Sequence, residues 1–583
     1  MPTLEWIGKS KVINHHQDVP FRVLERKYSF DENGQHDEDN GSENMIIRGD
    51  NLEALKALLP RYEGRVKCIY IDPPYNTGNE GWVYNDNVND PKIKKWLGEV
   101  VGKEGEDLTR HDKWLCMMYP RLKLLQKLLA DDGVIFISID DTEYANLKLI
   151  CDEIFGSNGF VSNISWQRTY STRNDSKGIV NEVEHLVVYS KLPDWNPNKL
   201  PRTAEMDAKY KNPDNDRTLW RTDNAFAPGA ATHQGMVYAI QHPFTGKMLY
   251  PANGRCWTFG QDQMLEIMRG WCGYELRDLN DAHERAVVCD VPESDVRQGV
   301  QAIVLSESLE ISAQKAQAVY DRGQWPRFFF TKGGKGGIAR KIYLENVGGK
   351  LPTNFWAFTE TGHTDEAKKE MLAIFDGKAT FDTPKPHRLI EFVLKVAGNE
   401  NALVLDSFAG SGTTAHAVLN MNKADGGHRK FILVEMMDYA DSITAERVKR
   451  VIRGYGEGKN AVEGTGGNFS FYDLGEPLLH GDVLNENVGV EKIREYVYFT
   501  DTKASLPESH PDEPYFMGVH IGSAYYFYYE KQAVTTLNRE FLHTVKTEAD
   551  AYVIYADLCT LSEAELEKYH ITFKKIPRDI TKL

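Results

Sequence analysis

VKCIYIDPPY, residues 66–75, decides the predicted fold, because its apolar half has the length and composition of a buried strand. NLEALKALLP (51–60) is predicted to be a helix before it, and LCMMYPRLKLLQKLLADD (115–132) an amphipathic helix after it. GVIFISID (133–140) is a second predicted strand, followed by a helix at 142–155. This alternation of buried strands and helices is typical of a doubly wound parallel α/β sheet.

A second block with the same alternation follows much later in the chain. The first block closes with the predicted strand HLVVYS (185–190), and the second opens with the predicted helix PHRLIEFVLKVAG (386–398). ALVLDSF (402–408) and RKFILVE (429–435) are its predicted strands. Two further helices are expected, at 414–424 and 442–454. The core is therefore predicted to be divided in the sequence.

The segment between the two blocks lacks this alternation and is too long for a loop, so we expect an inserted domain. Aromatic-rich, strand-like pieces such as 514–532 predict a small C-terminal α/β or α+β domain, and the polar run 30–44 predicts a flexible loop. The predicted domains are an N-terminal extension (1–45), two core segments (46–195 and 376–470), an inserted domain (196–375) and a C-terminal domain (471–583).

The composition is that of an ordinary globular protein, with 41% hydrophobic residues and a net charge of −16. No apolar run approaches the roughly 18 residues of a membrane span. The opening MPTLEWIGKSKVINHH lacks the continuous apolar segment of a secretory signal, so we expect a soluble, cytoplasmic protein. The seven cysteines are scattered without a CxxC pair, which predicts reduced thiols and no metal site.

The net negative charge of the chain by itself disfavours nucleic-acid binding, but one segment is basic. RGQWPRFFFTKGGKGGIARKIY (322–343) holds six basic residues, no acidic residue and several interleaved aromatics. This composition suits a surface that contacts phosphates and bases, and it equally suits a solvated basic hairpin. The candidate nucleic-acid contacts in it are Arg327, Lys332, Lys335, Arg340 and Lys341.

Asp72, Pro73, Pro74 and Tyr75 follow directly on the first predicted strand, at the sheet edge where α/β enzymes bind ligands. The Asp72 carboxylate and the Pro73 carbonyl can each accept an N–H from an aromatic amine such as that of adenine. This localises the lone pair of the amine and aims it at a methyl donor. The two prolines stiffen the loop, and Tyr75 can stack on the base. The alternative interpretation is a plain Pro-Pro turn.

The second motif, DSFAGSGTT (406–414), joins a predicted strand to a helix, so Gly410 and Gly412 can turn the backbone tightly beside a ligand. Its spacing is neither GxGxxG nor that of a GK[ST] phosphate loop, which favours an adenosyl cofactor without phosphates. Glu435, at the end of the next strand, is placed to accept hydrogen bonds from ribose hydroxyls. Asp50 is a candidate partner for a cofactor ammonium or a simple helix N-cap.

DPPY and FAGSGTT in this order resemble the beta group of DNA amino-methyltransferases, in which a target-recognition domain lies between the catalytic and cofactor motifs. GDNLEALKALLP, HDKWLCMMYPRLKLL and FDTPKPHRLI resemble, more narrowly, the modification subunits of type III restriction-modification systems. The resemblance covers residues 46–195 and 376–455. It implies a Rossmann-like class I methyltransferase core with permuted motif order, S-adenosylmethionine as cofactor, and adenine-N6 methylation of duplex DNA after base flipping.

The resemblance also implies roles for single residues and for partners. It assigns the target adenine to the DPPY residues, Asp72, Pro73, Pro74 and Tyr75. The cofactor contacts that it implies are Asp406, Phe408, Gly410, Gly412, Thr413 and Glu435, together with Lys385 and Pro386 of TPKP. It further implies a homodimer and a helicase-nuclease restriction partner. This sequence contains no nuclease or helicase motif, so any cleavage would need that partner.

Several alternatives remain open. A cytosine-N4 methyltransferase shares the fold and the chemistry, although it more usually carries Ser at the position of Asp72. An RNA guanine methyltransferase can also carry DPPY, but those chains resemble small enzymes with the cofactor motif first. An orphan adenine methyltransferase has no nuclease partner, and a DNA-binding specificity subunit binds without turnover.

Overall fold

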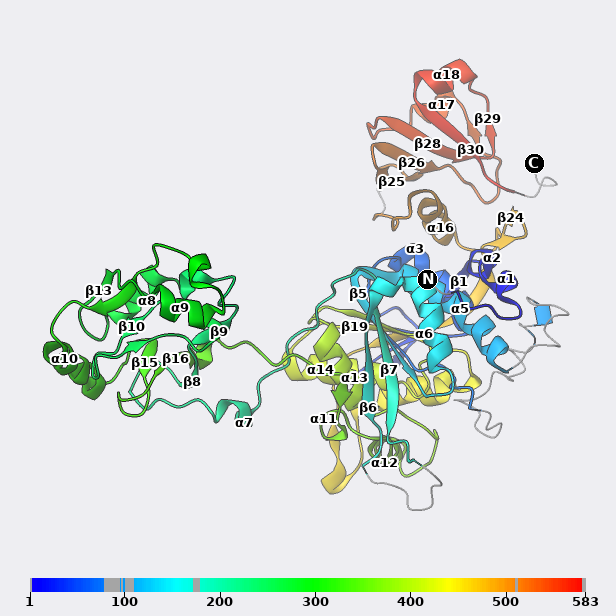
Figure 1. Ribbon diagram of the computed structural model, residues 1–583. Coiled ribbons are helices and arrows are strands. Elements are labelled where there is room, and N and C mark those ends of the chain that lie inside the picture. The colour runs from blue at the N-terminus through cyan, green and yellow to red at the C-terminus, as the bar shows by residue number, and fades with distance from the viewer. Residues whose placement is uncertain are drawn as a thin grey trace. The chain divides into compact units, whose positions relative to one another are not determined.

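The computed structural model describes residues 3–77, 110–170, 179–508 and 512–578, together with Lys95, Gly98 and Glu99. Its main feature is an eleven-stranded sheet, in the order β17-β6-β7-β5-β4-β18-β19-β3-β22-β1-β2 (Figure 1). The chain divides into two compact units, of which Lys199–Leu351 is one and the residues on both sides of it form the other.

Six neighbouring strands of the large sheet are parallel, and they contain both halves of the predicted core. Nearly every residue of the central strands is buried, as expected for parallel strands covered on both faces. The structure confirms the predicted α/β class. The six strands are β5 (Leu129–Ile139), β4 (Val66–Ile71), β18 (Leu403–Asp406), β19 (Lys430–Glu435), β3 (Met45–Arg48) and β22 (Phe469–Pro477).

Helices pack on this sheet in two groups, each internally in contact. The first group contains α3 (Asn51–Tyr62), α5 (Arg110–Leu128) and α6 (Tyr144–Phe155), and the second α13 (His387–Ala397), α14 (Thr413–Asp425) and α15 (Glu446–Arg453). A π-helical segment, Asp441–Ala445, precedes α15. The helix predicted to reach residue 132 ends at Leu128, because Leu129 already pairs with Val66 in the sheet.

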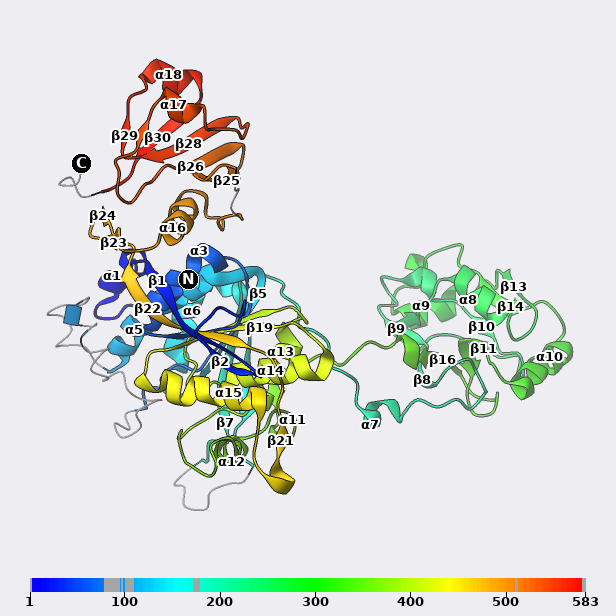
Figure 2. The same ribbon diagram turned by 180° about the vertical axis from the view of Figure 1, so that it is seen from behind.

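Both edges of the sheet extend beyond the parallel strands. One edge adds β7 (Val183–Ser190), β6 (Phe160–Gln167) and β17 (Phe355–Trp356), and the other adds β1 (Arg22–Asp31) and β2 (Gly34–His36), as Figure 2 shows for β1, β2 and β22. The flexible loop predicted over 30–44 is therefore wrong in its first part, which forms a β-hairpin. Aromatic pairs explain this, because Tyr28 and Phe30 stack on Phe471 and Phe469 of β22.

The inserted unit, Lys199–Leu351, has its own core of tryptophans and phenylalanines, and its larger sheets are β11-β10-β14-β13 and β15-β16-β8. It ends earlier than the predicted boundary at 375, because β17 returns to the large sheet and the Trp356 ring packs 4.6 Å from Phe392. Its main elements are β8 (Trp220–Asn224), β10 (Ile240–Gln241), β11 (Met248–Leu249), α8 (Gln261–Met268), β13 (Tyr274–Arg277), α9 (Ala282–Cys289), β14 (Ala302–Leu305), α10 (Leu309–Arg322), β15 (Phe328–Phe330) and β16 (Ile338–Tyr343).

The C-terminal residues form a four-stranded sheet, in the order β25-β26-β28-β30, with short helices beside it. The predicted boundary at 471 falls inside β22, which pairs with β3 and β1 and so belongs to the large sheet. No helix in the described part of the chain is both long and apolar enough to cross a membrane. The C-terminal elements are α16 (Val490–Thr502), β25 (Phe516–His520), β26 (Ser523–Phe527), α17 (Arg539–Leu542), β28 (Ala551–Ala556), α18 (Glu563–Lys568) and β30 (Ile571–Lys575).

Candidate active site

The two motif-bearing strands, β4 and β18, lie side by side and run parallel, with Val404 opposite Cys68. Asp406 ends β18, and Asp72 directly follows β4. The motifs DPPY and DSFAGSGTT therefore meet at one carboxyl edge. This is the topological switch point, from which the strand order proceeds in opposite directions. In open α/β sheets, ligands bind at such a point.

Asp72 lies at the centre of a buried group of polar side chains. The Lys385 ammonium donates to both carboxylate oxygens of Asp72 at 2.9 Å, and the Tyr75 hydroxyl donates to Oδ1 at 2.8 Å. Lys385 also donates to the Tyr75 oxygen at 2.8 Å and lies 3.5 Å from Glu184, which Arg168 contacts at 2.9 Å. Two cations thus face two carboxylates.

Charge and burial act against each other at this group. Burial raises the pKa of Asp72, and the neighbouring Lys385 opposes the rise. Burial would also raise the pKa of Glu184, but Lys385 and Arg168 hold it below its ordinary value. The two carboxylates in turn raise the pKa of Lys385 despite its burial. Lys385 is thereby kept protonated next to Asp72.

The loop after Asp72 is fixed by partners from α5 and from the residue before α6. The indole N–H of Trp114 donates to the carbonyl of Pro74 at 2.7 Å. Asn76, with a left-handed backbone (φ +61°), donates to the fully buried Glu143 at 2.5 Å. These bonds hold the direction of the DPPY backbone, which an acceptor carbonyl at Pro73 requires.

The residues 406–414, hereafter the glycine loop, turn as the two glycines were predicted to allow. Gly410 and Gly412 have φ values of +52° and +82°, which residues other than glycine rarely adopt. A Cβ atom on Gly412 would lie 2.9 Å from the carbonyl oxygen of Thr444. The Thr444 hydroxyl in turn donates to the carbonyl of Gly410 at 2.6 Å. The loop is therefore packed closely against the segment before α15.

Two buried acids at strand ends organise the glycine loop. Glu435 accepts hydrogen bonds from the backbone N–H of Gly410 at 2.8 Å and of Met437 at 2.9 Å. Asp406 accepts from the Phe408 N–H at 3.0 Å and from the Thr414 hydroxyl at 2.6 Å. Burial, with smaller contributions from nearby carboxylates, raises the pKa of Asp406 to about 7.

A small cavity of about 20 Å³ joins the motifs. It holds roughly one water molecule, so a ligand of cofactor size must displace lining side chains. Asp72, Lys385 and the glycine loop all contribute to its wall. The lining residues are Tyr70, Asp72, Phe381, Thr383, Pro384, Lys385, Asp406, Phe408, Ala409, Gly410, Ser411, Thr413 and Thr414.

Two predicted cofactor residues, Pro386 and Asp50, are not among the described residues that line this cavity. Pro386 is the N-cap of α13, directly after Lys385. Asp50 caps α3, because its Oδ1 accepts from the Leu52 N–H at 2.8 Å, and its Oδ2 lies 3.2 Å from a nitrogen of Arg121. The N-cap alternative for Asp50 is thus confirmed, and contact with a cofactor ammonium stays a prediction.

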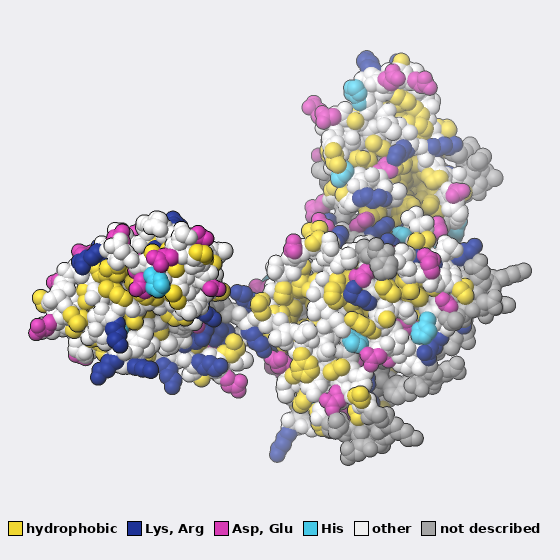
Figure 3. Space-filling view, viewed as in Figure 1, with side chains coloured by type: hydrophobic (Ala, Val, Ile, Leu, Met, Phe, Trp, Pro, Cys, Tyr) yellow, Lys and Arg dark blue, Asp and Glu magenta, His cyan; other side chains and the backbone are white. Residues whose placement is uncertain are grey.

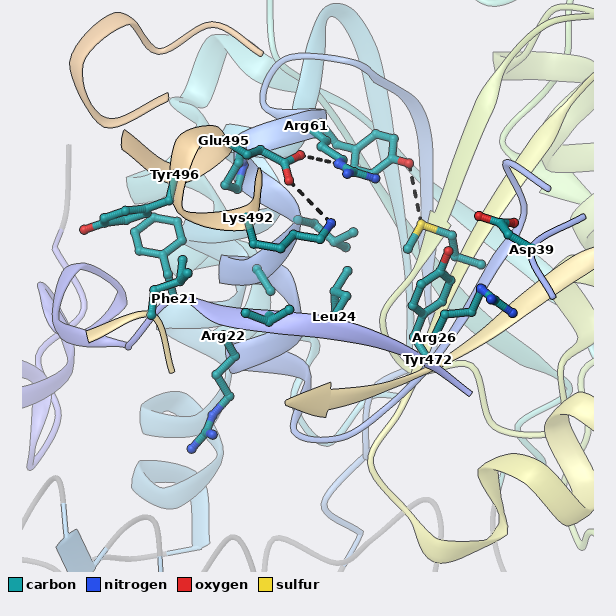
Figure 4. A pocket seen from close by; sticks show the side chains of 17 residues that line it. Phe21, Arg22, Leu24, Arg26, Asp39, Arg61, Tyr472, Lys492, Glu495 and Tyr496 are labelled. Carbon is teal, nitrogen blue, oxygen red and sulfur yellow. Dashed lines mark hydrogen bonds and ion pairs between the residues drawn. The ribbon is translucent and has the colours of Figure 1, made fainter. Parts of the chain in front are cut away.

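A larger cavity, of about 260 Å³, lies between β1, α3 and α16 (Figure 4). Tyr62, Tyr472 and Tyr496 contribute to its wall, and Glu495 pairs with Arg61 and lies 3.5 Å from Lys492. None of the described residues that line it comes from the DPPY motif or the glycine loop. Size therefore does not identify the active site, whereas the convergence of the motifs does.

The predicted nucleic-acid contacts divide in the structure. Arg327, Lys332 and Lys335 are exposed, whereas Arg340 is half-buried and pairs with Asp223 at 2.7 Å. Lys341 is fully buried, so its prediction as a nucleic-acid contact is wrong. Lys341 alternates with Arg340 along β16 and points to the interior. There it bonds Asp214, Asp216 and the carbonyl of Trp325.

One group of potential metal ligands occurs in the described part of the chain, where the sequence predicted none. Glu370, His387 and His416 place ligand atoms within 4.8 Å of one another. The buried guanidinium of Arg447 lies 3.1 Å from both Glu370 and His416. Arg447 therefore supplies the positive charge that a metal ion would bring.

Sequence reasoning missed the positioning roles of Glu184, Trp114 and Thr444, which hold the motif residues, although Trp114 lies in the segment HDKWLCMMYPRLKLL. Glu184 lies one residue before the strand predicted at 185–190, so its place at the sheet edge was the available signal. Nothing in the sequence pattern marked the contacts of Trp114 and Thr444, because these depend on the tertiary packing of α5 and of the segment before α15.

DPPY beside the glycine loop at the edge of a doubly wound sheet is the arrangement that the amino-methyltransferase class requires. The family model described as DNA methylase, which covers N6 and N4 methylases, matches residues 66–446. The chain therefore belongs to this DNA methylase family.

Relatives with described roles point in the same direction. The Mod subunit of the type III restriction-modification enzyme StyLTI of Salmonella typhimurium is 34% identical over 71% of this chain and 58% of its own length. The EcoPI Mod subunit of Escherichia phage P1 is 28% identical over 74% of this chain and 63% of its own length. The predicted resemblance to type III modification subunits is confirmed, and the chain spans about three fifths of the length of these two relatives.

Among solved structures, the PvuII DNA methyltransferase, which is cytosine-N4-specific, covers 70% of this chain and 86% of its own. Its TM-score is 0.31 at 13% sequence identity, so the fold assignment rests on the strand order of this chain.

Replacing Asp406 by Asn tests the raised pKa of its carboxyl group. An Asp whose pKa is raised on folding holds a proton in the folded state between about pH 4 and pH 7, so the stability falls as the pH rises through that window. We expect Asp406→Asn to flatten this fall, since an amide does not ionise. Melting temperatures from pH 4 to pH 8 measure it, with the exposed Asp132→Asn as control. Equal slopes in wild type and Asp406→Asn would contradict the assignment.

Replacing Lys341 by Met tests its structural role in the inserted unit. The change leaves the buried Asp214 and the adjacent Asp216 without their cation, which typically costs about 3–5 kcal/mol. Urea unfolding followed by tryptophan fluorescence measures the loss, because Trp220 and Trp325 lie beside Lys341. The exposed Lys335→Met is the control and should change the stability little. A similar small effect for Lys341→Met would refute the buried ion pair.

Proposed function

We propose that this chain transfers a methyl group from S-adenosylmethionine to the N6 amino group of adenine in duplex DNA, as the modification subunit of a type III restriction-modification system. The observation that carries the proposal is the placement of the DPPY carboxylate and the glycine loop on adjacent parallel strands around one cavity. The family membership and the Mod subunits among its relatives support it.

The cofactor residues fit an adenosyl group by their donor set. Glu435 is held by two backbone N–H groups, so its oxygens are oriented and keep lone pairs for ribose hydroxyls. The glycine loop presents backbone at Gly410 and Gly412, with Phe408 and Thr413 beside it. When bound, S-adenosylmethionine supplies an electrophilic methyl group, and its sulfonium sulfur becomes a neutral thioether when the methyl group is transferred. Asp406, Lys385, Pro386 and Asp50 complete the proposed cofactor side.

The DPPY residues act on the target base, which must leave the duplex to reach them. Asp72 and the Pro73 carbonyl each accept one N–H of the adenine amine, and this directs its lone pair toward the methyl donor. Lys385 opposes the rise in the pKa of Asp72 that burial causes, and this favours the carboxylate form that accepts the N–H. Tyr75, whose ring lies 5.0 Å from the Lys385 ammonium, stacks on the incoming base after giving up its bond to Asp72.

The inserted unit is the proposed target-recognition domain. It carries 20 Lys and Arg against 18 Asp and Glu, in a chain with 69 against 85 overall, so the acidic excess lies outside it. Figure 3 shows Lys and Arg side chains gathered along the edge of this unit that carries β15 and β8. We propose as phosphate contacts Arg327, directly before β15, and Lys332 and Lys335, in the exposed segment between β15 and β16, together with Arg340 of β16.

The proposed partners follow from the relatives. Type III Mod subunits are parts of a larger enzyme, as their names state. We propose that this chain also forms a homodimer, joins a helicase-nuclease restriction subunit and acts in the cytoplasm, where its DNA lies. Without such a partner it would be an orphan adenine methyltransferase.

Asp72→Ala is the direct test of the activity. In cells expressing the wild type, we expect N6-methyladenine on one strand of a short asymmetric site, and in the variant its loss by at least about 100-fold, because the amine loses its charged acceptor. Single-molecule sequencing of the DNA reads the modified base and its context. The exposed Asp132→Ala, beside Lys67, serves as the matched control and should methylate normally.

Other results of this sequencing would change the assignment. Methylation at cytosine N4 would replace the adenine assignment while keeping the mechanism. If cells that express the wild type contain neither modification, and the protein still binds DNA, the result would favour a specificity subunit without turnover.

Neutralising Lys332 and Lys335 tests the DNA surface. If each contacts one phosphate, Lys332→Gln/Lys335→Gln should weaken DNA binding at low salt and lower the slope of log K against log salt by about 2. Fluorescence anisotropy with a labelled duplex at several salt concentrations measures both. Lys315→Gln is the control, because Lys315 is already paired with Glu307 at 2.6 Å. An unchanged slope would exclude these lysines from the interface.

A further inference from the structure

Arg447, in the first turn of α15, is fully buried and holds the glycine loop by its hydroxyl groups. One guanidinium nitrogen donates to the Ser411 hydroxyl at 2.9 Å and to the Thr413 hydroxyl at 2.8 Å. Ser411 and Thr413 line the small cavity, whereas Arg447 is not among the described residues that do so. Arg447 therefore acts on the cavity through the loop and not by touching what enters it.

The Thr413 hydroxyl passes this constraint on to Lys385. A hydroxyl carries one proton, and arginine offers only donors, so Thr413 must accept from Arg447 and has its own proton free to donate. It donates to the backbone carbonyl of Lys385 at 3.3 Å. The Lys385 ammonium then donates to Asp72. One guanidinium thus connects the glycine loop, the TPKP segment and the catalytic carboxylate in sequence.

Glu370 on α12 (Thr364–Ile374) fixes the other side of Arg447. One oxygen of Glu370 lies 3.1 Å from the second guanidinium nitrogen, and the other lies 2.6 Å from Nδ1 of His387, the residue two positions after Lys385. Although burial would raise the pKa of Glu370, contacts with His387, His416 and Arg447 lower it to about 2. Glu370 is therefore a permanent anion that orients both the arginine and the start of α13.

We propose that Arg447 is a positioning residue for the cofactor: it holds Ser411 and Thr413, and through Thr413 the backbone of Lys385, in the conformation that binds the adenosyl group. The inference rests on the proposed function and extends it to a residue outside every motif considered above. A buried guanidinium with four partners is costly to desolvate, and its fork geometry explains why several groups from separate elements converge on it.

Binding of S-adenosylhomocysteine, measured by calorimetry, tests the proposal without turnover. Thr413→Val removes the relay hydroxyl and leaves Arg447 paired with Glu370, so it should raise the Kd about tenfold, as expected for one hydrogen bond to a charged donor. Arg447→Met should raise it further. Arg447→Lys keeps the charge opposite Glu370 without the fork and should lie between wild type and Arg447→Met.

Arg450 provides the matched control, because it lies on the same helix and pairs at the surface with Glu446 and Asp376. Arg450→Met should leave the Kd within about twofold of the wild type. In steady-state methylation, Arg447→Lys should raise the KM for S-adenosylmethionine and largely regain the wild-type kcat at saturating cofactor, since Arg447 touches no reacting group.

The outcomes separate this inference from the proposed function. If the wild type binds no S-adenosylhomocysteine, the proposed function itself fails. If the wild type binds it and Thr413→Val and Arg447→Lys bind it equally well, Arg447 is not a positioning residue, even where Arg447→Met lowers the melting temperature. A Kd that rises in all three variants, with Arg450→Met unchanged, is the result we expect.

Discussion

The parallel pairing of β4 with β18 is the constraint on which the candidate site depends. Cys68 and Val404 face each other although they are more than 330 residues apart in the chain. Each strand ends in one half of the chemistry, Asp72 from the first block and Asp406 from the second. Neither block alone contains an edge with both, so the site exists only when the two halves share one sheet. The strand order also reverses direction between β4 and β18. The connections therefore lead away from this edge on both sides and leave it open to ligands.

Charge balance is the second requirement of this edge, because several carboxylates are buried close together. Asp72 and Glu184 are offset by Lys385 and Arg168. Asp406 instead accepts hydrogen bonds from a backbone N–H and a hydroxyl group, and burial raises the pKa of its carboxyl group to about 7. A proton on Asp406 removes one negative charge beside Asp72. In the proposed mechanism, this favours the charged form of Asp72 as the acceptor of the adenine amine.

Local pattern was enough to predict most of the core from the sequence, and tertiary contacts account for what it could not predict. β4, β19 and α13 follow from apolar runs and helical periodicity, and Gly412 from the turn that its loop requires. The strand β1 was missed because its stability comes from aromatic pairs with β22, more than 400 residues later. Lys341 was misassigned because alternation along β16 places it inward, and a composition argument over 322–343 does not register which face a residue occupies.

The inserted unit is connected to the core at one edge of the large sheet. The core chain leaves after β7 and returns at β17, on either side of β6 at one edge of the sheet. Leu200 and Lys350 pair where the insert begins and ends, so the inserted unit is closed at its base by its own backbone bonds. Changes inside such a unit need not disturb β4, β18 or the loops that follow them. With the insert as the proposed target-recognition domain, substitution there can alter the DNA sequence that is recognised and leave the edge after β4 and β18 unchanged.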